Sequence, residues 1–195
     1  MTDLQSAVQA LQDGEVVVVP TDTVYGLACL PARPDAVAKI FELKGRSQTK
    51  ALPVLGASLS DLTDVAQFDL VARSLAEEFW PGPLTLVLSR ASAFDHDLGG
   101  SDPKTVAVRI PESKITAELM TLVGPLAVTS ANLSGEDPVA GVEQARALFG
   151  DRVSSYLDEG TCDSSPSTVV SLLEGLRVLR AGAISEERLR QAVTP

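Results

Sequence analysis

Four consecutive valines at positions 16–19 constrain the fold of this 195-residue chain more than any other feature. β-Branched apolar residues favour strands, and a strand without a polar face has to be covered on both sides. Such strands are typical of α/β proteins, whose sheets carry helices on both faces. The polar segment 21–26 follows the valines directly. It therefore lies at the end of a buried strand, where open α/β sheets commonly bind ligands.

The spacing of apolar residues predicts the other elements. We expect helices over 4–11, 34–43, mainly over 60–79, over 115–122 and 142–149, and after Ser185, with strands over 15–20, 52–55, 84–88, 105–110 and 126–128 and a hairpin of 168–173 with 176–179. Pro53 cannot donate to a strand ladder, so the strand at 52–55 is expected at an edge or a bulge. Residues 89–104 show no period and are expected to form a mobile loop. The chain is predicted to be one α/β domain, residues 1–195.

The net charge of the chain is −10 at pH 7. This charge argues against a protein that coats nucleic acid, because phosphate binding needs a basic surface. Residues 39–50 run against the trend, with Lys39, Lys44, Arg46 and Lys50 against Glu42. This basic segment is either a solvated helix end or an anion site.

The longest apolar runs are far shorter than the roughly 18 residues of a membrane-spanning helix, and the first residues do not resemble a secretory signal. We therefore expect a cytoplasmic protein without a membrane partner. Cys29 and Cys162 form no Cys-x-x-Cys pair, so buried or bystander thiols are expected, and no metal site is predicted. The one histidine, His96, lies between two aspartates and is expected to be a solvated loop residue.

Three common catalytic signatures are absent from the sequence: the P-loop, the Gly-x-Gly-x-x-Gly fingerprint and the Gly-x-Ser-x-Gly elbow. Hydroxyls, amides and cations at predicted strand ends remain. They are densest in 124–135, where an apolar run ends in Thr129, Ser130, Asn132 and Ser134. With the arginines and lysines elsewhere in the chain, these groups suit a triphosphate and a small zwitterion, since arginine can grip a carboxylate through two hydrogen bonds.

Six short motifs, in order along nearly the whole chain, carry a family resemblance. They are Lys44-Gly-Arg46, Trp80-Pro-Gly-Pro-Leu-Thr85, Val106-Ala-Val-Arg-Ile-Pro111, Thr129-Ser-Ala-Asn-Leu-Ser-Gly135, Ser167-Thr-Val-Val170 and Leu179-Arg-Ala-Gly182. With these motifs the chain resembles the YrdC/TsaC family of L-threonylcarbamoyladenylate synthases, in its short single-domain form. The resemblance implies a YrdC-like α/β fold, in which a twisted mixed sheet is flanked by helices and forms an open concave cavity.

The same resemblance implies a nucleotidyltransferase. ATP, L-threonine and bicarbonate or CO2 would give threonylcarbamoyl-AMP and pyrophosphate, with ATP as a substrate and Mg2+ assisting. This reaction is the first step toward N6-threonylcarbamoyladenosine (t6A) in tRNA. Expected partners are therefore downstream t6A-transfer proteins of the TsaB, TsaD and TsaE type, with tRNA as the pathway substrate.

Matching the motifs residue by residue implies three groups of site residues. Lys44, Arg46, Ser130 and Asn132 would meet the nucleotide and carry catalysis; Lys50, Thr85 and Arg180 would join the ATP side; Thr23, Arg109, Thr129 and Ser167 would line the threonine pocket. Three positions depart from the family pattern. Lys50 replaces an asparagine, Leu55 a histidine found in some relatives, and Ser171 an aspartate. A cation at position 50 still suits phosphate, whereas Leu55 is given no binding role.

Two other functions fit the same residues. A tRNA-binding module would use the cationic cavity without turnover, and its sign would be salt-dependent RNA binding without ATP chemistry. A sibling enzyme would adenylate or carbamoylate another substrate. A changed amino acid preference in a pyrophosphate assay would identify it.

Overall fold

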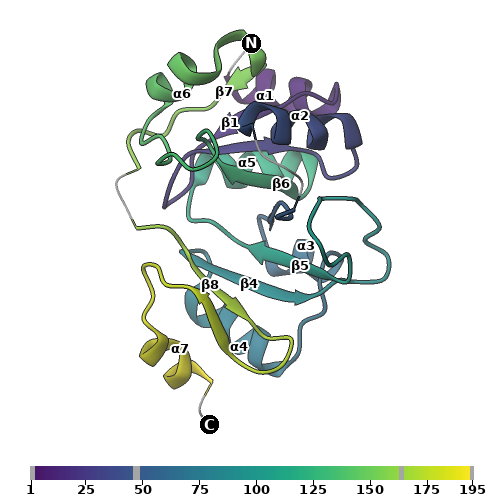
Figure 1. Ribbon diagram of the computed structural model, residues 1–195, viewed down its shortest axis with the longest axis vertical. Coiled ribbons are helices and arrows are strands. Elements are labelled where there is room, and N and C mark those ends of the chain that lie inside the picture. The colour runs from purple at the N-terminus through teal and green to yellow at the C-terminus, as the bar shows by residue number, and fades with distance from the viewer. Residues whose placement is uncertain (1–2, 46–48, 163–164, 194–195) are drawn as a thin grey trace.

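The structure is a computed structural model that describes residues 3–45, 49–162 and 165–193 (Figure 1). Its strands are β1 (Val17–Val19), β2 (Gly26–Cys29), β3 (Val54–Leu55), β4 (Leu84–Ser89), β5 (Thr105–Arg109), β6 (Leu126–Ser130), β7 (Ser155–Tyr156), β8 (Thr168–Ser171) and β9 (Arg177–Arg180). They form one sheet in the order β7-β1-β2-β6-β3-β5-β4-β8-β9. The pairs β1–β7, β3–β5 and β4–β8 are parallel and the other neighbours are antiparallel, so the sheet is mixed as predicted.

The helices that the structure describes are α1 (Asp3–Gln12), α2 (Pro34–Lys44), α3 (Leu59–Thr63), α4 (Leu70–Phe79), α5 (Lys114–Val123), α6 (Val142–Phe149) and α7 (Glu186–Ala192), with a short 3-10 helix at Gly150–Arg152. Apart from α3 and α4, these helices follow the predicted positions closely. Within these described helices, none has the length and apolar character needed to cross a bilayer.

The valine run divides its side chains between two cores. Val16 and Val18 belong to a larger core that also includes residues of α2, α4 and α6, whereas Val17 and Val19 pack with α1 and α5. All four side chains are fully buried. The predicted strand covered on both faces is therefore confirmed.

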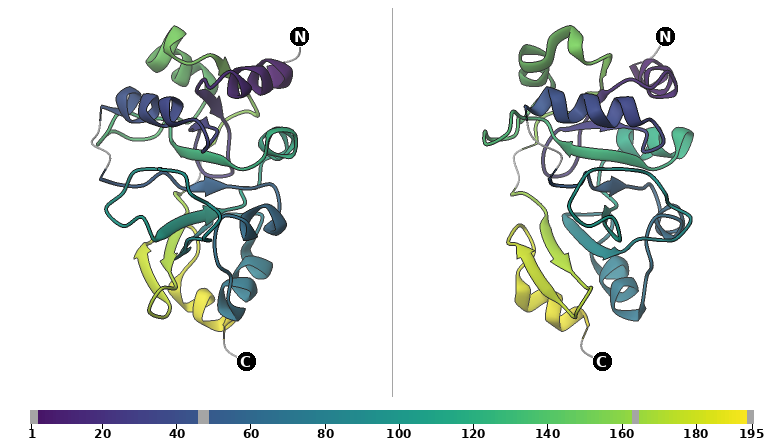
Figure 2. Two further views of the ribbon diagram at one scale, coloured as in Figure 1. Left: turned by 90° about the vertical axis from the view of Figure 1, so that its right-hand side faces the viewer. Right: turned by 45° about the vertical axis from the view of Figure 1, so that its right-hand side comes forward.

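The molecule has two halves along its long axis (Figures 1 and 2). One half holds α1, α2, α5 and α6 around β1, β2 and β6; the other holds α3, α4 and α7 beside β4, β5, β8 and β9. β3 lies where the halves meet, because it pairs with β6 on one side and with β5 on the other. A site near β3 can therefore contain residues from both halves of the molecule.

The predicted helix over 60–79 is in fact two helices, α3 and α4, separated by residues 64–69. Ala66 in this segment forms an isolated bridge with Arg90, and the Asp69 side chain caps α4 by accepting from the amide of Ala72. Val65 and Ala66 are buried in the same core as the helices. The apolar pattern therefore continued through the break, and spacing could not locate it.

The prediction that the strand at 52–55 lies at an edge is wrong, because β3 is central in the sheet. The strand is reduced to Val54 and Leu55, so Pro53 lies just outside it. The Pro53 carbonyl still accepts a hydrogen bond from the Val128 amide at 2.8 Å. Because Pro53 lies outside β3, its missing N–H removes no hydrogen bond between the strands.

β2 was not predicted as a strand, although all its residues are buried. Its first residue is Gly26, where a Cβ atom would lie 2.6 Å from the Cγ1 atom of Val128 and 3.2 Å from the carbonyl oxygen of Thr129. A strand that opens on glycine and follows a polar segment gives a weak sequence signal. The close approach of β6 explains the glycine.

Residues 89–104 form neither helix nor regular strand beyond Ser89, as predicted, but they are anchored to the core. Phe94 and Leu98 are buried, and the carbonyl of Leu98 accepts from the amide of Leu52 at 2.9 Å. His96 is half-buried and packs edge-on against Phe94, with ring centroids 4.9 Å apart. His96 is thus less solvated than expected.

Candidate active site

A buried lysine organises the first cluster of predicted site residues, Lys44, Ser130 and Asn132, here called the lysine cluster. Lys44 is 2% exposed. Its Nζ donates to the carbonyl oxygens of Ser130 (2.6 Å) and Asn132 (3.0 Å) and to Oδ1 of Asn132 (2.7 Å). Ser130 Oγ donates to the same Oδ1 at 2.6 Å. The predicted nucleotide residues Lys44, Ser130 and Asn132 are therefore in direct contact.

Local structure explains why the lysine cluster forms. Lys44 is the last residue of α2, and Gly45 ends the helix in the left-handed region at φ +60°, which glycine adopts at little cost. The carbonyl of Lys44 accepts from the amide of Ser134 at 2.9 Å. The Asn132 amide nitrogen Nδ2 donates to the carbonyl of Glu136 at 2.6 Å. The turn after β6 is thus tied to the end of α2, and the Asn132 side chain has a fixed orientation.

A buried arginine organises the second cluster, Arg109 with Asp22, Thr23 and Gly82, here called the arginine cluster. Nη2 of Arg109 lies 2.6 Å from Oδ1 of Asp22. Nη1 donates to Oγ1 of Thr23 at 3.0 Å, and Nε donates to the carbonyl of Gly82 at 2.9 Å. These bonds fix the guanidinium plane, and a second N–H on each terminal nitrogen has no acceptor among the described residues.

Burial and a counter-charge act in opposite directions on Arg109. Burial lowers the pKa of Arg109, while the charge and hydrogen bond of Asp22 raise it; the nearby charge of Arg180 lowers it. Asp22 also accepts from the amide of Glu112 at 3.0 Å. The carboxylate thus compensates the buried guanidinium and fastens loop 21–25 to β5 and the residues after it.

Thr85, Ser167 and Arg180 come together beside the arginine cluster. Thr85 Oγ1 and Ser167 Oγ are 2.9 Å apart, and Nη2 of Arg180 donates to both Oγ and the carbonyl of Ser167, each at 2.9 Å. A Cβ atom at Gly182 would lie 2.2 Å from the carbonyl oxygen of Pro166. Glycine at this position therefore allows the chain after β9 to approach Ser167 closely.

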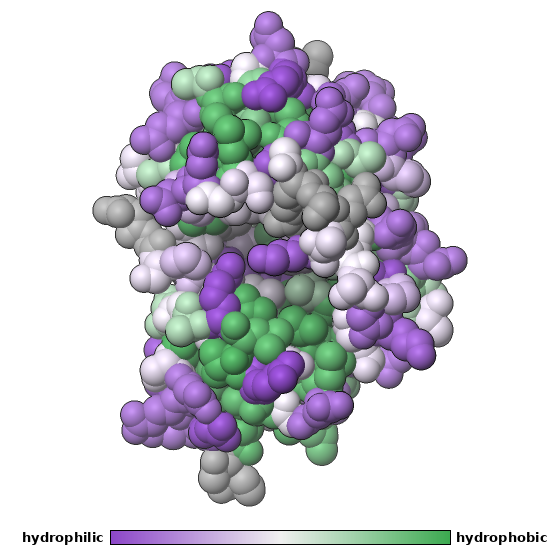
Figure 3. All heavy atoms as spheres, viewed as in Figure 1, coloured by the Kyte–Doolittle hydropathy of each residue, from purple (hydrophilic) through white to green (hydrophobic). Residues whose placement is uncertain are grey.

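Loop 21–25 joins the two clusters. Thr23 at its centre bonds Arg109, and the carbonyl of Tyr25 at its end accepts from the amide of Ala131 at 2.7 Å. Beyond the loop, Gly26 pairs with Ser130 in the sheet. The two clusters thus lie on either side of one five-residue loop, at the level where the halves of the molecule meet. Figure 3 shows this face hollowed at the same level, with hydrophilic side chains around the hollow.

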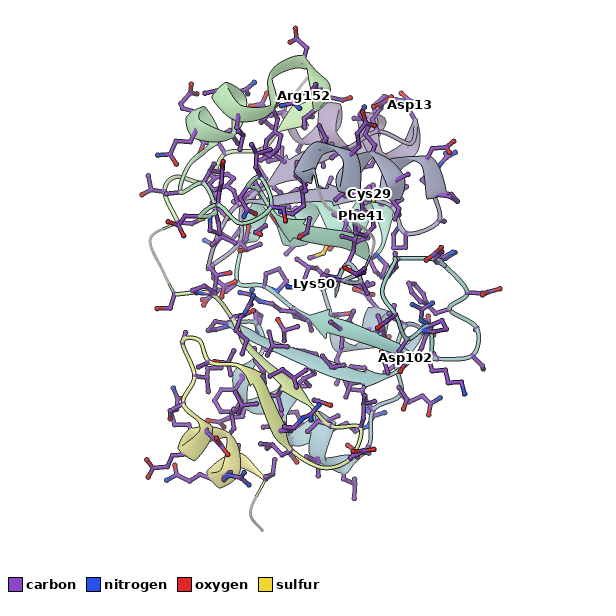
Figure 4. All side chains as sticks on the ribbon, viewed as in Figure 1. Asp13, Cys29, Phe41, Lys50, Asp102 and Arg152 are labelled. Carbon is purple, nitrogen blue, oxygen red and sulfur yellow. The ribbon has the colours of Figure 1, made fainter. Side chains whose placement is uncertain are left out.

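The remaining predicted residues differ in how closely they join these clusters. Arg46 lies outside the described residues. Lys50 is exposed and, in Figure 4, lies at the level where the two halves meet. Thr129 is half-buried and pairs with Leu27 in the sheet.

Sequence reasoning missed the role of Asp22, which lies between two threonines in a recognised polar segment. A buried arginine requires a compensating carboxylate. The predicted position of Arg109 near the end of a buried strand could therefore have indicated that Asp22 has a role. Tyr25 and Glu159 were also missed. The Tyr25 hydroxyl lies 2.6 Å from the carbonyl oxygen of Gly160, and Glu159 accepts from Ser113 Oγ at 2.5 Å at the start of α5. Segment 158–160 therefore holds the end of loop 21–25 through hydrogen bonds to the Tyr25 hydroxyl.

Both cysteines are free thiols, as expected. Cys29 is fully buried, and burial raises its pKa to about 12. Cys162 is half-buried and donates to the carbonyl of Thr21 at 3.0 Å. In the ranges that the structure describes, no three His, Cys, Asp or Glu side chains form a group able to hold a metal ion.

Two surface pockets lie away from both clusters. One of about 480 Å³ lies beside Tyr156, and one of about 410 Å³ lies around Arg90. Neither is lined by a predicted site residue. We place the candidate active site at the two clusters because buried charges and converging hydrogen-bonding groups, rather than cavity size, provide the chemistry.

Sequence comparisons agree with the motifs. The profile of a family named for Sua5, YciO and YrdC, with the description "Telomere recombination", matches residues 9–182. A Mycobacterium tuberculosis relative, provisionally named a threonylcarbamoyl-AMP synthase, is 40% identical over 96% of this chain and 88% of its own length. The Bacillus subtilis threonylcarbamoyl-AMP synthase is 35% identical over 98% of this chain and 57% of its own length.

A solved structure agrees with the fold. The P. abyssi Sua5 structure complexed with L-threonine matches with a TM-score of 0.92 and 33% identity, over 99% of this chain and 58% of that chain. This chain thus spans little more than half the length of the Bacillus and P. abyssi proteins. The predicted twisted mixed sheet flanked by helices is confirmed, and the chain belongs to the Sua5/YciO/YrdC family.

Proposed function

We propose that this protein is an L-threonylcarbamoyladenylate synthase, a nucleotidyltransferase that forms threonylcarbamoyl-AMP and pyrophosphate from L-threonine, CO2 or bicarbonate, and ATP. The observation that carries the proposal is the placement of the lysine and arginine clusters on either side of loop 21–25. The names of the mycobacterial and Bacillus relatives support the same activity.

The arginine cluster provides the groups for L-threonine. The two unused N–H groups of Arg109 suit the amino acid carboxylate, since guanidinium binds carboxylate through paired hydrogen bonds. The hydroxyls of Thr23 and Ser167 are held by Arg109 and Arg180. Thr129, at the end of β6, would complete this pocket.

The lysine cluster provides the groups for ATP. Lys44 has three N–H donors, and three oxygens of Ser130 and Asn132 accept from it. We therefore assign Lys44 to the nucleotide chiefly through its charge and through its hold on Asn132. Ser130, Asn132 and Lys50 would contact the phosphates, with Arg46. Thr85 and Arg180 contact Ser167 beside the arginine cluster, so they would contact ATP from that side of the site.

The reaction then needs positioning more than a base. The ammonium group of threonine first loses a proton to solvent. The free amine nitrogen then forms a bond to the carbon of CO2 and loses a second proton to solvent, which gives a carbamate. One carbamate oxygen attacks the α-phosphorus, and the bond to the bridging oxygen breaks as pyrophosphate leaves with the electron pair. Because a carbamate is already ionised at neutral pH, no residue has to deprotonate it. Fixed cations lower the barrier by stabilising phosphate charge.

Mg2+ would accompany the nucleotide rather than occupy a resident protein site. The described residues offer no cluster of three metal-ligating side chains, and Mg2+ commonly binds through substrate phosphates and water. The ion would neutralise phosphate charge.

The pathway predictions follow from the product. A mixed anhydride of a carbamate and a phosphate is a reactive acyl donor, which suits transfer to tRNA by proteins of the TsaB, TsaD and TsaE type. We place this chain in the cytoplasm with that pathway. Direct binding of tRNA is not required for the synthesis step.

Pyrophosphate release tests the proposal. Purified protein with ATP, L-threonine, bicarbonate and Mg2+ should release pyrophosphate, and omission of any substrate should abolish the release. Arg46→Ala and Asn132→Ala should suppress it by at least about tenfold, with the circular dichroism spectrum unchanged. Arg73→Ala is the matched control, because Arg73 is exposed on α4, and it should retain full activity.

Other outcomes would select the alternative functions. Salt-sensitive RNA binding by a well-folded protein that releases no pyrophosphate would replace the enzyme by a tRNA-binding module. Release that depends on another amino acid, but not on threonine, would identify a sibling enzyme.

A further inference from the structure

Arg90 lies outside both clusters, at the end of β4, and its backbone is firmly held. Its amide donates to the carbonyl of Lys104 at 2.8 Å, and its carbonyl accepts from Nε2 of Gln67 at 3.1 Å. Arg90 also forms an isolated antiparallel β-bridge with Ala66. The position of this arginine is therefore set by two separate segments of the chain, at 66–67 and at Lys104.

One edge of the Arg90 guanidinium has no partner among the residues that the structure describes. Nη1 donates to the carbonyl of His96 at 2.9 Å, and the Phe94 ring centroid lies 5.7 Å from Cζ. Nε is buried and finds no hydrogen-bond partner within the described ranges, and Nη2 makes no bond to a described residue. A buried donor without a partner costs stability and needs an explanation. Nε and one terminal nitrogen form the side-on edge through which arginine binds two oxygens of a carboxylate or phosphate.

A pocket of about 410 Å³ adjoins this arginine. Its polar lining comprises Gln67, Ser89, Arg90, Ser92, Asp95 and Lys104. Two cations thus face one carboxylate in a chain whose net charge is −10. The Lys104 ammonium makes no ion pair with a described residue. The pocket is cationic, with hydroxyl and amide donors beside the charges.

We propose that this pocket is an oxyanion site for a phosphate group, separate from the candidate active site. The unpartnered edge of Arg90 would bind two phosphate oxygens, and Lys104 would compensate a second negative charge. Gln67 and the serines can donate to the remaining oxygens. Phosphate suits this pocket better than a carboxylate, because the side chains of Gln67, Ser89 and Ser92 can donate to oxygens that a carboxylate lacks. The site does not depend on the proposed synthase activity.

The Nε–Hε signal of Arg90 in a two-dimensional 1H–15N NMR spectrum reports directly on the empty edge. Inorganic phosphate, titrated at constant ionic strength with NaCl, should shift this signal saturably downfield, while the exposed Arg73 signal stays fixed. A parallel titration uses a short RNA hairpin. A response to phosphate identifies a free-phosphate site, and a response to RNA alone identifies a backbone phosphate. If neither ligand shifts the Arg90 signal, the proposal is wrong.

Two variants complete the test. Lys104→Gln removes an exposed ammonium with little risk to folding and should weaken the phosphate response of Arg90 about tenfold. Arg90→Lys keeps the charge but removes the paired edge, and binding followed at the Gln67 and Lys104 amides should weaken by at least as much. Lys114→Gln, at an exposed position on α5, is the control and should leave the affinity unchanged. Equal affinities in Lys104→Gln and wild type would overturn the assignment.

Discussion

The lysine and arginine clusters bury one cation each, but they hold it differently. Lys44 donates to three oxygens that carry no formal charge, whereas Arg109 forms an ion pair with Asp22. The side chain of Arg109 is 7% exposed and that of Asp22 is 14% exposed. Removal of Lys44 leaves neutral acceptors, two of which keep another donor. Removal of Arg109 leaves a largely buried carboxylate without its guanidinium. The first cluster should therefore tolerate substitution better than the second, although we propose that both belong to the active site.

Arg109→Met should have the largest effect on stability. Removal of one partner of a buried ion pair costs about 3–5 kcal/mol, and the pair of Arg109 and Asp22 is largely buried. We expect a loss of that size in the free energy of unfolding, measured with urea at pH 7, together with loss of threonine-dependent pyrophosphate release.

The double variant Asp22→Asn/Arg109→Met separates the ion pair from general packing. It should be more stable than Arg109→Met alone, since the unpaired charge is gone. The loss of stability in the double variant could instead equal the sum of the losses in Asp22→Asn and Arg109→Met. That result would show that the two side chains are not coupled and that the proposed difference between the clusters is wrong.

Lys44→Met should destabilise the protein less, by about 1–2 kcal/mol, because the loss amounts to a few hydrogen bonds to neutral oxygens. Its effect on catalysis should nevertheless be large, as Asn132 loses the group that orients it. Urea unfolding and the KM for ATP are the measurements. A loss equal to that of Arg109→Met would remove the distinction between the two clusters.

Tyr25→Phe tests the loop that joins the clusters. The variant loses the hydrogen bond to Gly160 and should cost about 1 kcal/mol. Burial raises the pKa of Tyr25 to about 12, so the native state retains this proton where an unfolded tyrosine, with a pKa near 10, has lost it. The contribution of Tyr25 to stability is thus complete below pH 10 and falls as pH rises toward 12.

The alkaline part of this prediction has its own readout. Tyrosinate absorbance of the folded protein should show little ionisation at pH 10, because the pKa of Tyr156 is also raised by burial. Wild-type stability should decline more between pH 10 and 12 than that of Tyr25→Phe. Parallel declines would contradict the assignment.

The exposed pair of Lys39 and Glu15 should show the smallest effect. Their charged atoms are 2.6 Å apart, but the side chains are 34% and 41% exposed. Lys39→Met should cost no more than about 0.5 kcal/mol at pH 7. Lys39 lowers the pKa of Glu15 below 4.5, so this contribution is present above about pH 4.5 and is lost as pH falls through the lower native value. If Lys39→Met destabilised the protein nearly as much as Arg109→Met, burial would not explain why the ion pairs differ in their contribution to stability.

Sequence patterns predicted the elements whose residues report their own environment. The valines at 16–19 predicted burial on both faces. The helix expected after Ser185 is α7, and the Ser185 side chain caps it by accepting from the amide of Arg188. The central place of β3 could not be predicted, because it depends on partners distant in the sequence. The break between α3 and α4 was hidden because its residues are as apolar as those of the helices.

The same distinction applies to the site. Motifs singled out Lys44, Ser130, Asn132, Thr23 and Arg109 as candidate site residues, and the structure brings them into two clusters. The names of the relatives agree with the predicted family and activity. The motifs did not show that Arg109 depends on Asp22, or that Arg180 holds Ser167. Such contacts arise only when separate segments fold together. The assignment of each residue to ATP or threonine stays a prediction.

Calorimetric binding of L-threonine and of ATP to Arg109→Lys and Asn132→Ala tests the division of the site most directly. Arg109→Lys keeps a cation beside Asp22 but loses the paired hydrogen bonds, so threonine affinity should fall at least about tenfold while ATP affinity changes little. Asn132→Ala should show the reverse. If Asn132→Ala loses threonine affinity alone, the division of the site between the two clusters is contradicted.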